Sequence, residues 1–476
     1  MTALLTRALL LSFVVMLIAG CADFKPSPLD PAESYALFES RTLDSAGLMD
    51  FIEANLHQKS SPWPPESWDL NMLTLAAFYY HPDLDVAREK RGLAKAGVIT
   101  AGERPNPTVG FTPEYNADSA AGISPWILGF NLNIPVETAG KRGYRMEKAA
   151  GLSEAARMNI AGEAWRVRKR LRGALLDLYA ALEREAALKR QQGLQREIAA
   201  VLEERLRRGE ASSPDVTFAR ISLDRTVIAL RDAEKQAAEA RSHLAGSVGL
   251  PDVALEHAAI SFNFLDELPE ALPAPEIRRQ ALLNRADILG SLYEYGALEA
   301  ALKLEAARQY PDINIGPGYK WDQGDNKWSL GFSVTIPVLN RNQGPIAEAL
   351  ARRKEARARF IALQARVSEE TGSALSGYRA ALEELHAADG LLATHRGYLA
   401  SAKSMFNAGE IDRLVLLGRE LEVESAVMAR LDAFVNAQRS LALLEDALQR
   451  PLGGEPSFAP PEAAPARDTM IKKEKA

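Results

Sequence analysis

The chain of 476 residues has a single cysteine, few aromatic residues and no surplus of basic charge. One cysteine excludes an internal disulfide. Aromatic residues make up only 7 % of the sequence, and the formal net charge is −6. Because the basic residues are interleaved with acidic ones, no basic stripe accumulates, and we expect no nucleic-acid partner.

Residues that carry chemistry are also sparse. The six histidines show no metal-ligand spacing, and the sequence has neither a phosphate-cradling glycine loop nor a nucleophile elbow. Paired carboxylates such as Glu203 and Glu204 are explained as the surface of a helix. The sequence therefore predicts no enzyme, no cofactor and no bound metal.

The N-terminus has the pattern of a secretory signal, which we place at residues 1–20. Arg7 is followed by the apolar run ALLLSFVVMLIAG, and Cys21 comes directly after Ile18, Ala19 and Gly20. This spacing resembles the bacterial lipobox, which implies that Cys21 is the site of lipid attachment. The alternative is a stray thiol in an ordinary signal peptide. In the family rule for lipoprotein sorting, an aspartate directly after the cysteine favours retention in the inner membrane. Ala22 stands at that position here, which favours the outer membrane.

The chain repeats itself with a separation near 200 residues. HPDL, LGFNLNIPV and RRGE in the first half correspond to RADI, LGFSVTIPV and NAGE in the second. Each unit is expected to be a helix, two strands, a very long helix and a returning helix. We divide the chain into an N-terminal anchor segment (21–66), a first repeat (67–249), a connector of short strands and loops (250–275), a second repeat (276–453) and a disordered tail (454–476).

The long helices are predicted from composition and periodicity. Charged residues make up 25 % of the chain, and alanine, leucine, glutamate and arginine fill the stretches 142–208 and 346–407. Each stretch would span on the order of 100 Å as a helix. A period of 3.5 predicts left-handed packing between neighbouring helices. The residues that show this period are Leu171, Leu175, Leu178 and Leu182 in the first stretch, and Leu375, Tyr378, Leu382, Leu385, Leu392 and Leu399 in the second.

Both long helices are expected to end at a tight turn that reverses the chain. Gly209 stops the first, with Ser213 as N-cap and Pro214 in the first position of the next helix; Gly409 and Asp412 play these parts in the second. The two turns form the ends of two helical hairpins. Their residues are Gly209, Glu210, Ser213, Asp215, Gly409, Glu410 and Asp412.

Two pairs of strands alternate between apolar and small polar residues. At about ten residues, each strand is long enough to cross a hydrocarbon core when tilted. A half-buried soluble hairpin packed on a helix would show the same alternation. If the strands do cross a membrane, several chains must share one barrel, because four strands cannot close one. The expected lipid-facing residues are Leu128, Phe130, Leu132, Ile134, Leu330, Phe332, Val334 and Ile336.

Together these motifs resemble the TolC-type outer-membrane efflux proteins over roughly residues 65–453. The motifs are the signal with its lipobox, the duplicated unit, NPTVGFTPEYN, LGFNLNIPVETAGKRG and LGFSVTIPVLNRNQGPIAEA. PVETAGKR further resembles the strand-to-helix turn of the lipoprotein components of heavy-metal efflux systems. The resemblance implies a mainly α fold with a small transmembrane β part. In it, three chains give four strands each to one twelve-stranded barrel that continues as an α-helical barrel across the periplasm.

The resemblance also implies partners and a gate. The partners are two further copies in a homotrimer, outer-membrane lipid, a periplasmic membrane-fusion adaptor at the hairpin turns, and an inner-membrane pump of the resistance-nodulation-division type. In the family, aspartate rings on the second hairpin close the tip, but Val415 and Gly418 occupy those positions here. The closure is then either acidic or apolar, and the gate candidates are Asp412, Leu414, Leu417 and Glu420.

The predicted function is a passive export duct in the bacterial outer membrane, lipid-anchored and extending into the periplasm, with heavy-metal cations as one candidate cargo. Ducts for drug efflux or type I secretion are alternatives within the same architecture. A periplasmic coiled-coil scaffold lipoprotein, whose strand pairs only pack on helices, is the alternative from another class.

Overall fold

The computed structural model describes residues 26–452 except 58, 60, 267 and 271, and the chain divides into two units, 1–42 and 43–476. In the first unit, α2 (Pro31–Glu39) is capped by Asp30, whose carboxylate accepts the Ala32 N–H at 2.8 Å. The expected signal, the Cys21 attachment site and the tail at 454–476 lie outside the described residues. All that follows concerns the second unit.

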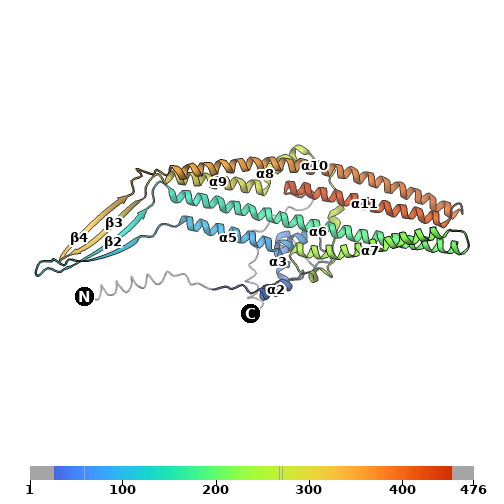
Figure 1. Ribbon diagram of the computed structural model, residues 1–476, viewed down its shortest axis with the longest axis horizontal. Coiled ribbons are helices and arrows are strands. Elements are labelled where there is room, and N and C mark those ends of the chain that lie inside the picture. Colours follow the sequence, from blue (N-terminus) through green and yellow to red (C-terminus); the bar gives the residue numbers. More distant parts are fainter. Residues whose placement is uncertain (1–25, 58, 60, 267, 271, 453–476) are drawn as a thin grey trace. The chain divides into compact units, whose positions relative to one another are not determined.

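The second unit contains the predicted order of elements twice. Each copy has a helix, two strands, a very long helix and a returning helix, as expected from the sequence (Figure 1). The elements are α3 (Ala46–Leu56), α4 (Leu70–Tyr80), α5 (Pro82–Gly102), β1 (Thr108–Tyr115), β2 (Trp126–Val136), α6 (Lys141–Arg207), α7 (Ser213–Val248), η1 (Asp252–Leu255), η2 (Asn263–Asp266), α8 (Ala274–Asn284), α9 (Ala286–Ala307), β3 (Ile313–Asp322), β4 (Asp325–Val334), α10 (Gln343–Asn407) and α11 (Arg413–Leu448).

The long helices α6 and α10 have 67 and 65 residues. Each starts after a residue in the left-handed region, Gly140 (φ 71°) and Asn342 (φ 60°), and each is followed by a turn with a left-handed glycine, Gly209 or Gly409. Such residues stop a helix cleanly because a left-handed backbone cannot continue a right-handed helix. Of the leucines at the 3.5 period, most are buried, as predicted. None of the described helices is apolar over a stretch long enough to cross a membrane.

The strands form one antiparallel sheet in the order β1-β2-β3-β4. The two hairpins have the same register, since Tyr115 lies opposite Trp126 in the first and Tyr319 lies opposite Trp328 in the second. β4 was expected to continue to Val338 but ends at Val334, which lies opposite Ile313, the first residue of β3. Beyond that point β3 offers no backbone groups with which β4 could pair.

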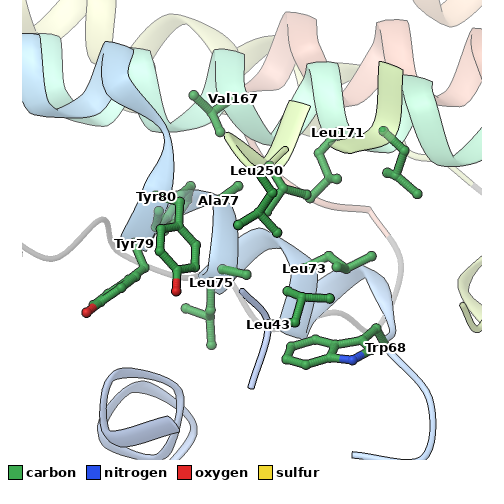
Figure 2. Packing of buried hydrophobic residues seen from close by; sticks show 14 of the residues in the cluster. Leu43, Trp68, Leu73, Leu75, Ala77, Tyr79, Tyr80, Val167, Leu171 and Leu250 are labelled. Atoms are coloured by element: carbon green, nitrogen blue, oxygen red, sulfur yellow. The ribbon is translucent and has the colours of Figure 1, made fainter. Parts of the chain in front are cut away.

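A hydrophobic core joins the N-terminal helices α3 and α4 to α6 and α7. Figure 2 shows Leu73 and Leu75 of α4 on one side of this core and Val167 and Leu171 of α6 on the other. Trp68 is buried in this core, and its backbone N–H donates to the Ala259 carbonyl of the connector at 2.8 Å. The prediction of short strands in 250–275 is wrong. Its described residues form η1, η2 and a single β-bridge to Trp68.

The first repeat meets the second along α6, which packs against α9 and α11. α6 and α11 run antiparallel and carry ion pairs that recur about every seven residues along α6. We call these pairs the α6–α11 ladder. Its spacing follows the heptad because residues seven apart return to the same face of packed helices. The pairs are Lys169–Asp446, Asp177–Arg439, Arg184–Asp432, Arg190–Glu424, Glu197–Arg413 and Arg205–Asp412.

A buried polar cluster accompanies the ladder. Arg172 is 4 % exposed and contacts Glu445, which is 2 % exposed. The Arg172 guanidinium also donates to the Gln438 side-chain oxygen at 3.0 Å, and the Gln438 amide donates to the Leu265 carbonyl of the connector. The cluster therefore ties the first repeat, the connector and the second repeat together at one buried point.

Replacement of Arg172 by methionine should destabilise the protein, because Glu445 would keep its buried charge and lose the nearer of its two guanidinium partners, with only Arg168 left at 3.5 Å. Removal of one member of a buried pair costs about 3–5 kcal/mol. The measurement is the unfolding midpoint of the purified protein by circular dichroism. Arg184→Met on the same helix is the matched control, since its partner Asp432 is exposed and such pairs contribute about 1 kcal/mol or less. Equal effects of the two variants would contradict a special role for the buried cluster.

Candidate functional site

One face of the sheet is apolar and open. All predicted lipid-facing residues that lie within strands share this face, since side chains alternate along each strand and pairs in register point the same way. Exposure reaches 68 % for Phe332, while Leu128 and Leu132 are half-buried. Ile336, the last of the predicted set, follows the end of β4 and is 73 % exposed. The apolar face also stacks aromatic rings, with Phe111 and Phe130 4.7 Å apart.

The opposite face is made of small and neutral residues in its middle. Asn131 lies between Gly110 and Gly318 on the neighbouring strands. A Cβ atom at Gly110 would fall 2.1 Å from the Asn131 side-chain oxygen, and one at Gly318 would fall 2.7 Å from the Ser329 hydroxyl. Glycine is therefore needed at both positions to make room for the polar side chains beside it. We call this the polar face.

Charged residues on the polar face gather at the end of the sheet away from the helices. Lys320 lies 3.5 Å from Glu114, and Lys327 contacts Asp322. Directly across β3 and β4 the charges are alike, since Lys320 lies opposite Lys327 and Asp322 opposite Asp325. The opposite charges meet diagonally, as in Lys327 with Asp322, or across β2, as in Lys320 with Glu114, and these contacts offset the like-charge pairs. The sequence predicted a face that is small and uncharged in most positions, with Glu114 and Lys320 on it, but did not identify these pairs.

The turn from β2 into α6 is fixed by cations that bind the ends of other elements. The Lys141 ammonium is almost fully buried, lies 2.7 Å from the Asp312 carboxylate and donates to the Tyr310 carbonyl at 2.6 Å. Arg142 donates to the Gly102 carbonyl at the end of α5 at 2.6 Å. Such contacts satisfy carbonyls that a helix end leaves open. Lys141 and Arg142 are the last two residues of the motif PVETAGKR. The sequence alone could not show which carbonyl and carboxylate groups they bind.

The two hairpin turns at the other end of the long helices have matching geometry (Figure 1). Gly209 and Gly409 have φ of 77° and 76°, and the residue after each donates its N–H to the carbonyl five positions earlier. The predicted N-cap Ser213 is wrong by one residue, since Ser212 caps α7 and Ser213 is its first residue. Asp215 is in the first turn as expected and completes a capping box with Ser212. All seven predicted turn residues are exposed.

The two capping aspartates differ in what they bind. The hydroxyl and backbone N–H of Ser212 donate to Asp215 and hold the pKa of that carboxyl below its usual value. Asp412 accepts the Val415 N–H, and its other oxygen lies 2.9 Å from Arg205 of α6; both contacts hold the pKa of Asp412 below its usual value. Asp412 therefore bridges the two hairpins, whereas Asp215 acts only within its own.

The gate candidates are separated by the structure. Leu417 is fully buried within the chain, so its side chain packs between helices and cannot line a passage; this candidate is corrected. Leu414 and Glu420 are half-buried, and Asp412 is exposed. Beside them, Arg413 makes two hydrogen bonds to Glu197 of α6, at 2.7 and 2.9 Å. The second hairpin is thus held to α6 by two adjacent ion pairs at the turn.

Within the described part of the chain, no group of three or more histidine, cysteine, aspartate or glutamate side chains lies together in a way that could hold a metal ion. The candidate functional regions in the described residues are therefore two surfaces. One is the two-faced sheet at one end of the long helices, and the other is the pair of hairpin turns at the opposite end.

Comparison with known proteins gives the family. The family model described as outer membrane efflux protein matches residues 77–250 and 277–454. The cobalt-zinc-cadmium resistance protein CzcC of Cupriavidus metallidurans is 26 % identical over 282 residues, which cover 59 % of this chain. The chain spans 65 % of that relative's length, just under two thirds.

Two solved structures show the same fold. The outer-membrane channel OprN superposes with a TM-score of 0.65 and 20 % identity, covering 90 % of this chain and 98 % of OprN. CusC superposes with a TM-score of 0.64 and 17 % identity, covering 90 % of this chain and 99 % of CusC. The predicted fold class, mainly α with a small β part, is confirmed, as is the predicted resemblance. Because one family model matches both repeats, the chain belongs to the outer membrane efflux protein family.

Proposed function

We propose that this chain is one subunit of a passive export duct in the outer membrane, built from three copies. The observation that carries the proposal is the two-faced sheet. Its open apolar face suits lipid, and its small polar face suits a water-filled lumen. A single chain leaves β1 and β4 as unpaired edges, which lipid does not tolerate, so the sheet needs neighbouring copies to close.

Aromatic residues support the placement of the strands in a membrane. Tyr115 and Trp126 stack at 5.1 Å, and Tyr319 and Trp328 stack at 4.8 Å, at the start of the return strand of each hairpin. Rings with an apolar body and a polar group favour the membrane interface. The family supports the same placement, as do the solved structures of OprN, an outer-membrane channel, and of CusC, which forms a transmembrane channel.

The finer parts of the proposal extend to the anchor, the partners and the cargo. Cys21 receives the lipid, the exposed turns around Gly209 and Gly409 meet a periplasmic adaptor, and the adaptor connects the duct to an inner-membrane pump of the resistance-nodulation-division type. The cargo we propose is heavy-metal cations, because the curated relative CzcC is named for resistance to cobalt, zinc and cadmium. A duct needs no tight metal site, since tight binding would prevent release.

Cargo is tested by deletion of the gene in its host and growth on a panel of divalent metals and of drugs. The expected result is lowered tolerance of divalent metals with unchanged tolerance of drugs, restored by the gene on a plasmid. If the deletion lowered tolerance of drugs but not of metals, the cargo would be a drug and the proposal of metal cations would be wrong. A secretion defect alone would favour the type I secretion alternative.

Replacement of Phe332 by aspartate should block assembly in the outer membrane, because the charge would face lipid at a cost on the order of 1 to 2 kcal/mol in each copy. The measurement is the amount of a detergent-resistant oligomer in outer-membrane fractions that collapses to monomer on boiling. Ser329→Asp is the matched control, since Ser329 lies on the polar face of the same strand and should assemble normally. A periplasmic scaffold would tolerate both substitutions and would show no such oligomer.

Replacement of Asp412 by asparagine should loosen the tip of the duct. Asparagine still caps α11, but it has no charge to pair with Arg205. We expect a higher single-channel conductance in planar bilayers than for the wild type. Asp215→Asn is the matched control, because Asp215 completes the capping box of α7 without bridging the hairpins, so the substitution should leave the conductance unchanged. Equal conductance of all three proteins would remove Asp412 from the closure.

Acid should have the same effect on the wild type. The folded-state pKa of Asp412 is lowered, so its contribution to the closed tip is complete above the unfolded value near pH 4 and is lost as the pH falls through the lowered pKa. Conductance of the wild type should therefore rise below about pH 4 toward that of Asp412→Asn, while the variant changes less. A wild-type conductance that stays constant down to about pH 2 would contradict this role.

A further inference from the structure

The end of β4 carries a short apolar extension that pairs with no described strand of the chain. Residues 335–338 follow the last residue that pairs with another strand, and Ile336 and Val338 are 73 % and 71 % exposed. Within the segment the Val338 N–H donates to the Ile336 carbonyl at 2.9 Å, a local bond that pairing with a strand would replace. The corresponding segment of the first repeat is paired, since Ile134 lies opposite Ile315 and Val136 lies opposite Ile313 in β3. The same sequence, IPV, is therefore a strand in one repeat and an unpaired extension in the other.

The correspondence between the repeats holds residue by residue in the sheet. β2 maps onto β4 with an offset of 202 residues, which aligns LGF and IPV. β1 maps onto β3 with an offset of 204, which aligns Pro107 with Pro311 and Tyr115 with Tyr319. The hairpin registers agree with these offsets, because the pair of Val109 with Leu132 becomes the observed pair of Ile313 with Val334.

The pairing of β2 with β3 joins the end of one hairpin to the start of the next. The equivalent pairing at the end of the second hairpin joins β4 to β1, and one chain cannot make it. In a single copy these two strands lie at opposite edges of the sheet, three strand spacings or about 14 Å apart. Only β1 of a second copy can complete the repeat.

We propose that β4 and its extension pair with β1 of a second copy in the register that the β2–β3 pair shows within the chain. This inference rests on the proposed oligomeric duct and adds to it the residues that meet between copies. Applying the two offsets to the observed β2–β3 register gives the pairs Phe332 with Tyr115, Ser333 with Glu114, Ile336 with Phe111, and Val338 with Val109.

The faces of the sheet agree with this register. Ile336 and Val338 would lie opposite Phe111 and Val109, which are 54 % and 68 % exposed on the apolar face of β1. A slip by one residue would set Ile336 opposite Gly110 or Thr112 of the polar face, because the side-chain period of a strand is two. The predicted register is thus one that keeps both faces continuous from copy to copy.

The turn after the extension would contact the residues that precede β1 of the second copy, as the turn after β2 contacts the residues that precede β3 within the chain. Within the chain, the Thr138 hydroxyl donates to the Pro311 carbonyl at 2.7 Å, and Lys141 pairs with Asp312. By the same offsets, Asn340 and Gln343 meet Pro107 and Thr108 of the second copy. Gln343 is exposed in the single chain. The junction between copies is therefore neutral where the junction within the chain is charged.

Cysteine crosslinking tests the register. The variant Ser333→Cys/Glu114→Cys places two thiols opposite each other, as Asn131 and Gly318 are in the chain, at a separation that a disulfide can span. Within one copy the two positions are too far apart to react. After mild oxidation of outer-membrane fractions and boiling without reductant, the protein should shift from monomer to dimer and trimer bands, and reductant should reverse the shift.

The matched control is Ser333→Cys/Thr112→Cys, which moves one thiol two residues along the same face and should stay largely monomeric. The wild type, with Cys21 alone, gives the background. Crosslinking of the control in place of the first variant would overturn the register, and so would the absence of crosslinks in both while the unboiled oligomer persists. Loss of the oligomer from the wild type itself would instead contradict the proposed duct.

An introduced charge pair tests the predicted contact between Gln343 and Thr108 of the second copy. Gln343→Lys with Thr108→Asp should re-create, between copies, the contact that Lys141 and Asp312 make within the chain. We expect the unboiled oligomer of the double variant to survive to a higher temperature than that of either single variant. Survival of the double variant only to the temperature expected from the two single effects added together would overturn this part of the inference.

Discussion

The requirement that every backbone N–H and C=O of a strand has a partner governs this molecule. β2 and β3 are bordered on both sides, but β1 and β4 each have one strand beside them within the described residues. Backbone groups left open in an apolar environment cost free energy comparable to a lost hydrogen bond. The exposed apolar rows on the strands and the early end of β4 follow from the same cause, which is that the sheet of one chain is a fragment of a larger closed surface.

Sequence patterns predicted the parts of the structure that are local or periodic. The duplication, the lengths of α6 and α10, the glycine turns and the alternating strand faces all follow from spacing along the chain. Contacts between distant segments were not predictable in this way. The pair of Arg172 with Glu445 joins residues 273 positions apart, and in the sequence both look like ordinary charges of a solvated helix. Leu417 was likewise indistinguishable from an exposed leucine until α11 was seen against its neighbours.

The two repeats have diverged in the surfaces that they offer. On α6 the ladder positions are charged and meet α11. Shifted by the 200 residues that separate Gly209 from Gly409, several of the same positions on α10 are glycine, namely Gly377, Gly390 and Gly397. A Cβ atom at any of these glycines would meet nothing within 4 Å in the single chain. Glycine inside a helix costs about 1 kcal/mol relative to alanine, so their presence on α10 is not explained by the fold of one copy.

The ladder between α6 and α11 also determines how its two helices can move against each other. Its signs do not repeat uniformly along the helix. A slide by one heptad would set Lys169 against Arg439 and Asp177 against Asp432, replacing attraction by repulsion at these two steps and leaving the other pairs without a charged partner. Near the turn, where the pairs are exposed, moving α11 away from α6 separates charges into water at little cost. Farther along α11, the buried pair of Arg172 with Glu445 holds the two helices together. Sliding is therefore opposed mainly at the end of the ladder that lies far from the turn, and the end of α11 near the turn is the part that separates most easily from α6.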